Sequence, residues 1–339
     1  MNSITVKVLE KRCEYKENPL GIDTPKPRFS WKIKALKRAA GQVAYNIQVW
    51  DETGKCIWDT GKCESDNTVN VQYEGQPLES RKEYRWTLKV WDKQGDEYET
   101  DAEKFETAIL EDSEWKAEWI RGGNLLRKEF SADKKIKKSR VYISGLGYYE
   151  LYINGDKIGN HVLDPAWTDF DQKIYYSVYD VTESVKKGKN AVGVMLGNGR
   201  YSPYETTIAK NWHPLKKYGE SPVLFYQQYV YYEDGSEDII VSDLSWKVSD
   251  GPIVFDDIYD GIGFSMIIDT SGKIISCDSG LSYRKIGIND NVYDFYTKSG
   301  EVTEKTMKSA KANIKKQKSG ILVLKEKNAM SYLAYEPLH

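Results

Sequence analysis

Short apolar segments separated by turn residues are the feature of this sequence that most restricts its fold. Around residues 144–203, apolar and aromatic runs alternate with turn signals such as Asn154-Gly155 and Gly188-Lys189-Asn190. An Asn-Gly pair between two such runs is a strong signal for a two-residue β-hairpin. The pattern therefore predicts antiparallel sheets built from short strands. The predicted strands are Val141–Ser144, Tyr149–Ile153, Tyr175–Tyr179 and Ala191–Leu196.

Residues 1–110 predict one small β-sandwich. Phe29, Trp31 and Ile33 alternate along one predicted strand, and a second strand beginning at Tyr84 alternates in the same way. Turn residues at intervals of about 8–12 are typical of fibronectin type III or immunoglobulin-like sandwiches. Leu78 followed by Tyr84 resembles the tyrosine corner of fibronectin type III modules, in which the phenol anchors the entry to a strand.

Composition supports folded β-rich domains and excludes some classes of partner. The chain has 339 residues, of which 40% are apolar and 13% aromatic, and aromatic side chains suit the half-buried surface of a sheet. Aromatic rings also stack on sugar faces, although most of the 25 Tyr and 10 Trp residues are expected in cores and cross-strand pairs. A net charge of −2 gives no reason to expect nucleic acid or an anionic membrane as a partner.

The N-terminal residues, the cysteines and the histidines predict a cytoplasmic protein without a histidine-based metal centre. The N-terminal segment is polar and charged, with no apolar signal-peptide core, and no stretch approaches eighteen apolar residues. The cysteines form no Cys-x-x-Cys pair, and free thiols are expected: Cys13, Cys56, Cys63 and Cys277. The three histidines are too few and too far apart to indicate a metal cluster: His161, His213 and His339.

Four motifs in order carry a resemblance to a known family. They read G-x-Y-E-L-Y-I-N-G-D-K-I-G, P-x-W-T-D-F, Y-D-V-T and L-G-N-G-R-Y, and together they resemble the N-terminal β-sandwich of bacterial α-L-rhamnosidases. The opening string NPLGIDTPKPRFSWKI, with YNIQVWD, resembles the module that begins many of these enzymes. The resemblance implies an all-β fold of tandem sandwiches. A fibronectin type III or immunoglobulin-like module would span residues 1–110, and a galactose-binding-like jelly roll residues 111–260.

The resemblance weakens beyond residue 261, and residues 261–339 form a Lys-rich tail. This tail is either a divergent third domain or a segment that no longer follows the family. Within it, Glu304–Lys318 has the spacing of a basic helix, with Met307, Ala310 and Ile314 on one side.

The chemistry of a glycosidase is missing from the sequence. An inverting glycosidase needs two carboxyl groups about 6.5–9.5 Å apart, with room for a water molecule. The rhamnosidase family places this pair in an (α/α)₆ barrel, and no series of paired amphipathic helices is evident here. The family's acidic string ending in Trp-x-Gly-Asp also has no counterpart. The resemblance thus implies a non-catalytic front part of a rhamnosidase, inactive alone. It would support hydrolysis of terminal α-L-rhamnose by a barrel that lies downstream or is separately encoded.

The resemblance also implies a calcium site, because related modules hold rhamnose through a calcium ion at loops of the jelly roll. Calcium takes six to eight oxygen ligands from carboxylates, amides and carbonyl groups. Asn198 offers an amide oxygen and Pro203 a carbonyl, whereas Glu150 and Asn154 belong to a hairpin that the family brings near this loop. The alternative is that Asn154 and Asn198 only form turns, and this alternative is stronger for Asn154.

The predicted sugar contacts are Trp167, Asp169, Arg200 and Tyr201. Trp167 is either a sugar platform or part of the core, and Asp169 either binds a hydroxyl or ion or caps a turn. The chain has Asn-Gly-Arg at 198–200 where many relatives carry Asp-Gly-Trp, which predicts weak affinity. Rhamnose-containing glycans or glycosides are the expected partners. A structural or adhesive pair of sandwiches with no sugar ligand is the alternative.

Overall fold

The computed structural model describes residues 6–38, 40–203 and 217–250, together with short strands between residues 253 and 324. The chain divides into two compact units, which are described separately. The first comprises residues 1–116 with 178–180, and the second comprises residues 117–177 with 181–339. No helix among the described residues is both long enough and apolar enough to cross a membrane.

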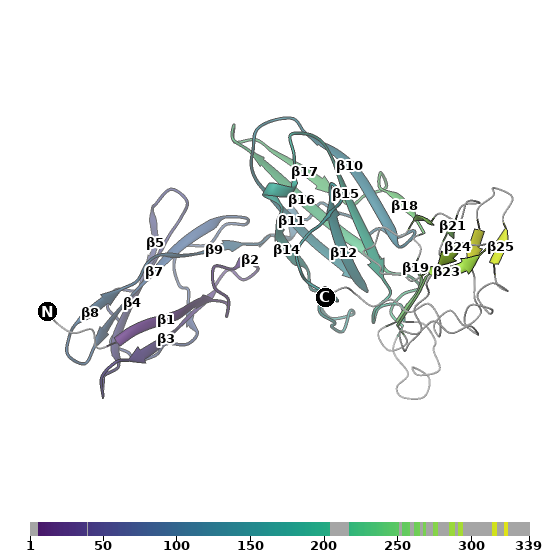
Figure 1. The fold of residues 1–339 in the computed structure, drawn as a ribbon. Coiled ribbons are helices and arrows are strands. Elements are labelled where there is room, and N and C mark those ends of the chain that lie inside the picture. Colours follow the sequence, from purple (N-terminus) through teal and green to yellow (C-terminus); the bar gives the residue numbers. More distant parts are fainter. Residues whose placement is uncertain are drawn as a thin grey trace. The chain divides into compact units, whose positions relative to one another are not determined.

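The first unit contains two β-sheets (Figure 1). A three-stranded sheet has the order β1-β3-β6, and a second sheet has the order β2-β9-β7-β4-β5, with β8 also paired to β7. The strands of the first sheet are β1 (Val6–Cys13), β3 (Arg28–Ala35) and β6 (Val71–Gln72). Those of the second are β2 (Leu20–Ile22), β4 (Gln42–Trp50), β5 (Cys56–Asp59), β7 (Glu83–Asp92), β8 (Glu97–Glu99) and β9 (Glu103–Thr107).

An aromatic cluster fills the core of this unit. The rings of Phe29 and Trp86 lie 4.6 Å apart, and Tyr84 stacks on Phe105 at 5.3 Å. The alternation predicted for β3 and β7 is confirmed, because the inward-facing residues of both strands are buried. The exception is Ile33, which lies near the end of β3 and is half-buried. The backbone N–H of Glu79 donates to the Tyr84 hydroxyl at 2.8 Å, which is the predicted tyrosine corner.

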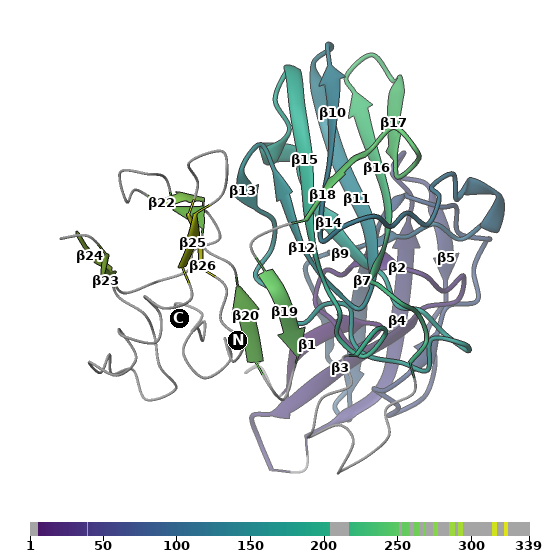
Figure 2. The same cartoon turned by 90° about the vertical axis from the view of Figure 1, so that its right-hand side faces the viewer.

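The second unit is built on two antiparallel sheets (Figures 1 and 2). The five-stranded sheet has the order β13-β12-β15-β10-β18, and the four-stranded sheet β14-β11-β16-β17. The strands of the former are β10 (Leu125–Ala132), β12 (Tyr148–Ile153), β13 (Asp156–Lys157), β15 (Gly188–Gly197) and β18 (Lys247–Ser249). Those of the latter are β11 (Ile136–Leu146), β16 (Val223–Tyr232), β17 (Glu237–Val241) and the edge strand β14 (Ser177–Asp180), of which residues 178–180 are grouped with the first unit.

Strand β15 is central to the five-stranded sheet and alternates strictly between two faces. Val192, Val194 and Leu196 are buried, whereas the residues between them point to the other face and are half-buried. Its partner β12 is antiparallel and ends in the Asn154-Gly155 turn, whose φ angles are 55° and 95°. Two positive φ values at an Asn-Gly pair define the predicted hairpin turn, since both residues tolerate the left-handed region.

The described part of the chain is all-β, as predicted. Its only helical segments are two short 3₁₀ turns, η1 (Asp112–Glu114) and η2 (Thr182–Ser184). Further strands follow the second sandwich: β19 (Ile253–Asp257), β20 (Gly261–Phe264), β21 (Ile267–Ile268), β22 (Ile274–Ser276), β23 (Lys285–Ile288), β24 (Asn291–Tyr293), β25 (Ile314–Lys316) and β26 (Leu322–Leu324).

The basic helix predicted for Glu304–Lys318 is wrong where the structure describes it. Ile314–Lys316 is strand β25 and pairs with the apolar strand β26. Pairing with an apolar strand favours the extended conformation here over the amphipathic helix that the spacing suggested. The rest of the predicted helix lies outside the described residues.

Candidate functional site

Asn154 forms a hydrogen-bonded turn at the start of β15. Its side-chain oxygen accepts a hydrogen bond from Ala191 N–H at 3.0 Å, and its backbone N–H donates to Ala191 C=O at 2.8 Å. Its side-chain amide nitrogen donates to the Ser184 carbonyl at 2.9 Å and to Asn190 Oδ1 at 2.8 Å. Both ends of the amide are therefore engaged with protein groups, as expected of a residue that stabilises a turn.

Asn198 lies at the opposite end of the same strand. It follows Gly197, the last residue of β15, and is seven residues beyond Ala191. At about 3.3 Å per residue, this separation is about 23 Å. A single ion cannot contact both Asn154 and Asn198, so the structure does not bring the predicted calcium ligands together. The reason is the antiparallel pairing, which places the hairpin beside the start of β15 and the loop after its end.

Glu150 lies between these two ends and is paired with other side chains. Lys157 Nζ donates to its Oε1 at 2.5 Å, and the Tyr152 hydroxyl donates to its Oε2 at 2.7 Å. Burial raises the pKa of Glu150, but the hydrogen bonds from Lys157 and Tyr152 outweigh burial, and the net pKa is lowered. Its strand partner is Met195, three residues before Asn198, so Glu150 is about 10 Å from the loop along the strand.

The loop that follows β15 is held by Asp256, a residue that sequence reasoning missed. The backbone N–H and side-chain amide of Asn198 donate to the Asp256 carboxylate at 2.6 and 2.5 Å. Ser202 Oγ donates to Asn198 Oδ1 at 2.8 Å. Asp256 belongs to β19, 58 residues further along the chain, and no local spacing rule connects it to Asn198.

The oxygen atoms at this end of β15 are of the kind that suits calcium. The Asp256 carboxylate accepts two hydrogen bonds from Asn198, and a carboxylate oxygen can serve more than one partner. Asn198 Oδ1 retains one lone pair, and Pro203, which is buried, adds a carbonyl oxygen to the same loop. Among the described residues no three His, Cys, Asp or Glu side chains are grouped for a metal, so this set is poor in carboxylates.

An aromatic cluster lies beside this loop and brings two predicted sugar-binding residues together. Phe170 makes edge contacts with Tyr201 at 5.5 Å and Tyr218 at 5.2 Å. Tyr218 N–H donates to Tyr201 C=O at 2.9 Å, and its hydroxyl donates to Asp169 Oδ1 at 3.0 Å. Asp169 and Tyr201 therefore share a contact with Tyr218, which sequence reasoning missed because it lies in a segment without a motif.

The other two predicted residues, Trp167 and Arg200, form a pair at the surface. The Trp167 side chain is 59% exposed, which excludes a place in the core. The Arg200 guanidinium carbon lies 5.5 Å from the centre of the indole ring, within cation–π range. An exposed flat ring next to a guanidinium group presents an apolar surface and several hydrogen-bond donors side by side.

Asp164 anchors the start of the segment that carries Trp167. Its carboxylate accepts hydrogen bonds from the hydroxyl groups of Tyr149 and Ser177, both at 2.6 Å. Its carbonyl accepts from Tyr149 N–H at 3.0 Å. These bonds tie the segment to β12 and β14, so the exposed ring is carried by a segment that is fixed at its base.

Comparisons with known proteins agree with this architecture. Residues 8–111 match the family described as the Rha78A-like N-terminal immunoglobulin domain, and residues 134–265 match the alpha-L-rhamnosidase N-terminal domain. An alpha-L-rhamnosidase of Formosa agariphila is 36% identical over 286 residues, and one of Alteromonas sp. is 30% identical over 280. These matches cover 73% and 75% of this chain, but only 30% of each relative.

Comparison with solved structures also matches this chain to part of the length of α-L-rhamnosidases. The structure of alpha-L-rhamnosidase from Dictyoglumus thermophilum matches with a TM-score of 0.69 and 34% identity, covering all of this chain and 36% of that one. The Aspergillus terreus enzyme matches with a TM-score of 0.69 and 28% identity, over 89% of this chain and 35% of that one. The chain thus spans about a third of the length of its relatives. Through both of its sandwich domains, it belongs to the α-L-rhamnosidase family and corresponds to the N-terminal region of these proteins.

Proposed function

We propose that this chain is the non-catalytic N-terminal region of an α-L-rhamnosidase and that its second sandwich binds rhamnose-containing glycans. The relatives named alpha-L-rhamnosidase extend well beyond the region they share with this chain, which supports a catalytic part located elsewhere. The described residues contain strands and two 3₁₀ turns, not the helices of an (α/α)₆ barrel. On this proposal the chain alone hydrolyses no rhamnoside, and its catalytic partner lies downstream or is separately encoded.

The observation that carries the sugar-binding part is the exposed Trp167 ring beside Arg200. The apolar face of a sugar ring would stack on the indole, while the guanidinium group donates hydrogen bonds to the sugar hydroxyls. Phe170 and Tyr201 lie on the same two segments as Trp167 and Arg200, and with Tyr218 they form an aromatic cluster. The affinity would be weak, because the surface is open and water competes for every hydroxyl.

The calcium prediction is kept for a smaller set of residues. The proposed ligands are Asn198, Pro203 and Asp256, whereas Asn154 is engaged at the opposite end of β15. Calcium at this loop would supply positive charge for adjacent sugar hydroxyls.

The proposed location of the protein is the cytoplasm. The free thiols of Cys13, Cys56 and Cys63, among the described residues, support this proposal.

Calorimetric titration of L-rhamnose into the purified chain tests the sugar site. Trp167→Ala should weaken binding about tenfold, since aromatic stacking contributes about 0.5–1.5 kcal/mol beyond the buried area. Val162→Ala is the matched control, because Val162 lies on the same segment and is 77% exposed. Equal binding by wild type and Trp167→Ala would place the sugar elsewhere. If wild type does not bind, a purely structural pair of sandwiches is the better interpretation.

The same titration tests the calcium site, and a separate assay tests catalysis. Adding a chelator, or replacing Asp256 by Asn, should lower the affinity for rhamnose if calcium bridges the sugar and this loop. Release of nitrophenol from a nitrophenyl α-L-rhamnoside should not exceed that of a boiled sample. Turnover clearly above the boiled sample would contradict the non-catalytic assignment.

A further inference from the structure

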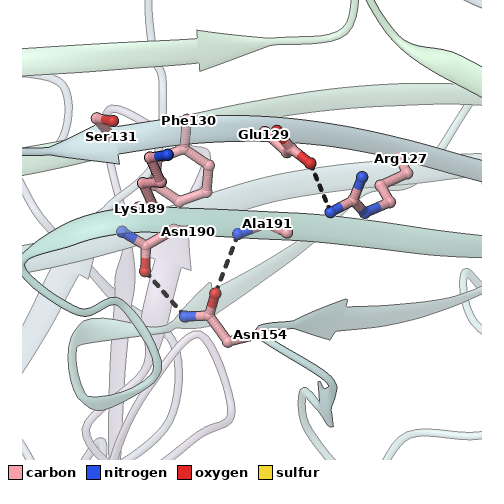
Figure 3. Close-up of a pocket in the computed structure, with 8 residues that line it drawn as sticks. All are labelled: Arg127, Glu129, Phe130, Ser131, Asn154, Lys189, Asn190 and Ala191. Carbon is pink, nitrogen blue, oxygen red and sulfur yellow. Dashed lines mark hydrogen bonds and ion pairs between the residues drawn. The ribbon is translucent and has the colours of Figure 1, made fainter.

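The exposed face of the five-stranded sheet carries a trough along β15, at the end of this strand that is remote from the Trp167 surface. Its volume is about 680 Å³, within the range of small-molecule sites. Residues of β10 and β15 line it, together with Asn154 of the hairpin turn (Figure 3). The lining residues used in the argument below are Arg127, Glu129, Phe130, Lys189 and Ala191.

A small residue on the exposed face of β15, Ala191, lines the trough. Two residues further along the same face, Gly193 lies beside the trough, between Tyr152 of β12 and Arg127 of β10. A Cβ atom built on Gly193 meets only the Tyr152 Cβ, at 4.0 Å. Glycine in the middle of a strand weakens the strand, and it often marks a place where a ligand approaches the backbone closely.

The wall formed by β10 carries an ion pair that faces solvent. Arg127 Nη2 lies 2.7 Å from Glu129 Oε1, and the two side chains are 51% and 64% exposed. The hydrogen bond from Arg127 lowers the pKa of Glu129, with smaller contributions from Lys247 and Lys189. The pair therefore presents fixed hydrogen-bond donors and acceptors at the edge of the trough (Figure 3).

The charge around the trough is positive. Lys189 lies at one end and is exposed, and Lys247 of β18 is the strand partner of Arg127. Three cationic side chains thus surround one carboxylate, that of Glu129, which leaves an excess of two positive charges. Mixed donors and acceptors around Ala191, with the ring of Phe130 also in the lining, suit the hydroxyl groups and apolar face of a sugar, and the excess charge suits an anionic substituent.

We propose that this trough is a second saccharide site, which binds a sugar unit bearing a carboxylate or sulfate group. The site is independent of the proposed rhamnose surface, because Asn154 and Asn198 mark opposite ends of β15, about 23 Å apart. The sugar ring lies over Ala191 and Gly193, its hydroxyls bond to Arg127 and Glu129, and its anionic group lies toward Lys189 or Lys247.

Titration of the full chain with trigalacturonate, compared with its methyl ester, tests this proposal. A second pair of titrations compares glucose 6-sulfate with glucose. Together the two pairs show whether the trough recognises a carboxylate or a sulfate group. Gly193→Leu places a bulky side chain beside Arg127 at the edge of the trough, where a Cβ has room, and should abolish binding of the anionic sugar. Lys247→Gln and Lys189→Gln should each weaken binding about two- to fivefold, as expected for exposed charges, and the effect should shrink as salt is added.

Two controls separate this site from the rest of the molecule. Lys137→Gln removes an exposed charge from the other sheet and should leave binding unchanged. Trp167→Ala should also leave it unchanged, so a failure of the rhamnose site is distinguishable from a failure of this one. Binding of the methyl ester or glucose as tightly as the anionic sugars would overturn the proposal. So would full binding by a folded Gly193→Leu variant, or no binding by wild type in either arm.

Discussion

The two Asn-Gly pairs at the ends of β15 look alike in sequence and differ in structure. In Asn154-Gly155, the first residue has a positive φ and its side chain bonds to Ser184, Asn190 and Ala191. In Asn198-Gly199, only the glycine has a positive φ, and the asparagine bonds to an acidic residue from a distant strand. The first pair closes a hairpin, whereas the second fixes the loop beside the aromatic cluster.

The difference shows that an Asn-Gly pair predicts a turn, but neither the φ angle of the asparagine nor the role of its side chain. Both pairs suit turns because Asn and Gly tolerate positive φ angles. The register of β12 against β15 places Asn154 beside Ala191. Asn198 lies past the end of β15 and binds the carboxylate of Asp256, which belongs to β19. If this interpretation is correct, substitutions at the two asparagines should affect different properties of the protein.

The largest effect is expected for Asn154→Ala, which should lower the free energy of unfolding of the second unit. The variant loses three side-chain hydrogen bonds and must place alanine at a φ of 55°. Together these losses should cost about 2–4 kcal/mol, measured by urea denaturation. Asn154→Gly is the matched control: it loses the same bonds without the strain, and should be less destabilised by about 1 kcal/mol.

Binding measurements on the same variants test whether Asn154 is separate from the sugar-binding loop. Folded Asn154→Gly should bind rhamnose as wild type does, because the residue lies about 23 Å from the loop. If this variant keeps its fold but loses rhamnose or calcium binding, Asn154 is a ligand of the calcium site after all. That result would contradict the assignment of different roles to the two ends of β15.

Asn198→Ala should lower the free energy of unfolding less than Asn154→Ala does, and it should lower the affinity for rhamnose more. The variant keeps the backbone N–H bond to Asp256 but loses the side-chain bonds to Asp256 and Ser202. The cost should be about 1–2 kcal/mol, because one of the lost bonds is made to a charged group. Rhamnose affinity should fall in the calorimeter. Unchanged affinity would mean that this loop does not shape the sugar surface.

The sequence was sufficient for the main strands of the two sandwiches and for the turn at Asn154, because both depend on local patterns. It failed at β25, and it placed the strand at Tyr175–Tyr179 where the structure has Ser177–Asp180. Alternation along β7 predicted its buried face, and the spacing of Leu78 and Tyr84 predicted the tyrosine corner. The exposed trough could not be found this way. Its floor and walls come from strands that are distant in sequence, and the relevance of Gly193 appears only once Tyr152 and Arg127 flank it.

The candidate sugar site was predicted only in part, for the same reason. Trp167 and Arg200 came from two motifs of the family resemblance, and the structure places them together. Asp256 and Tyr218 were missed because each acts through a contact with a residue far along the chain. Glu150 was placed in the calcium set from the hairpin it belongs to, whereas its partner is Lys157 of the neighbouring strand.

The smallest predicted effect concerns this Glu150–Lys157 pair, which spans the hairpin at the Asn154 end. Burial raises the pKa of Glu150, but the hydrogen bonds from Lys157 and Tyr152 bring the net pKa below its ordinary value of 4.5. A carboxyl with a lowered pKa in the folded state stabilises the protein above its ordinary pKa. This contribution is lost as the pH falls through the lowered value. Glu150→Gln should therefore lose less thermal stability than wild type on acidification below about pH 4.5.

The difference should be at most about 0.5 kcal/mol, because the Glu150 side chain is 42% exposed and solvent screens the pair. Melting curves of both proteins between neutral and acidic pH, at low and high salt, measure it. Glu183→Gln, an exposed carboxylate in the same unit, controls for the change in net charge. A Glu150→Gln curve parallel to wild type at every pH would mean that the pair adds no stability. Among the side chains of the hairpin, Asn154 would then carry the stabilising bonds, in addition to the backbone pairing of β12 with β13, and the contrast between the two ends of β15 would become sharper.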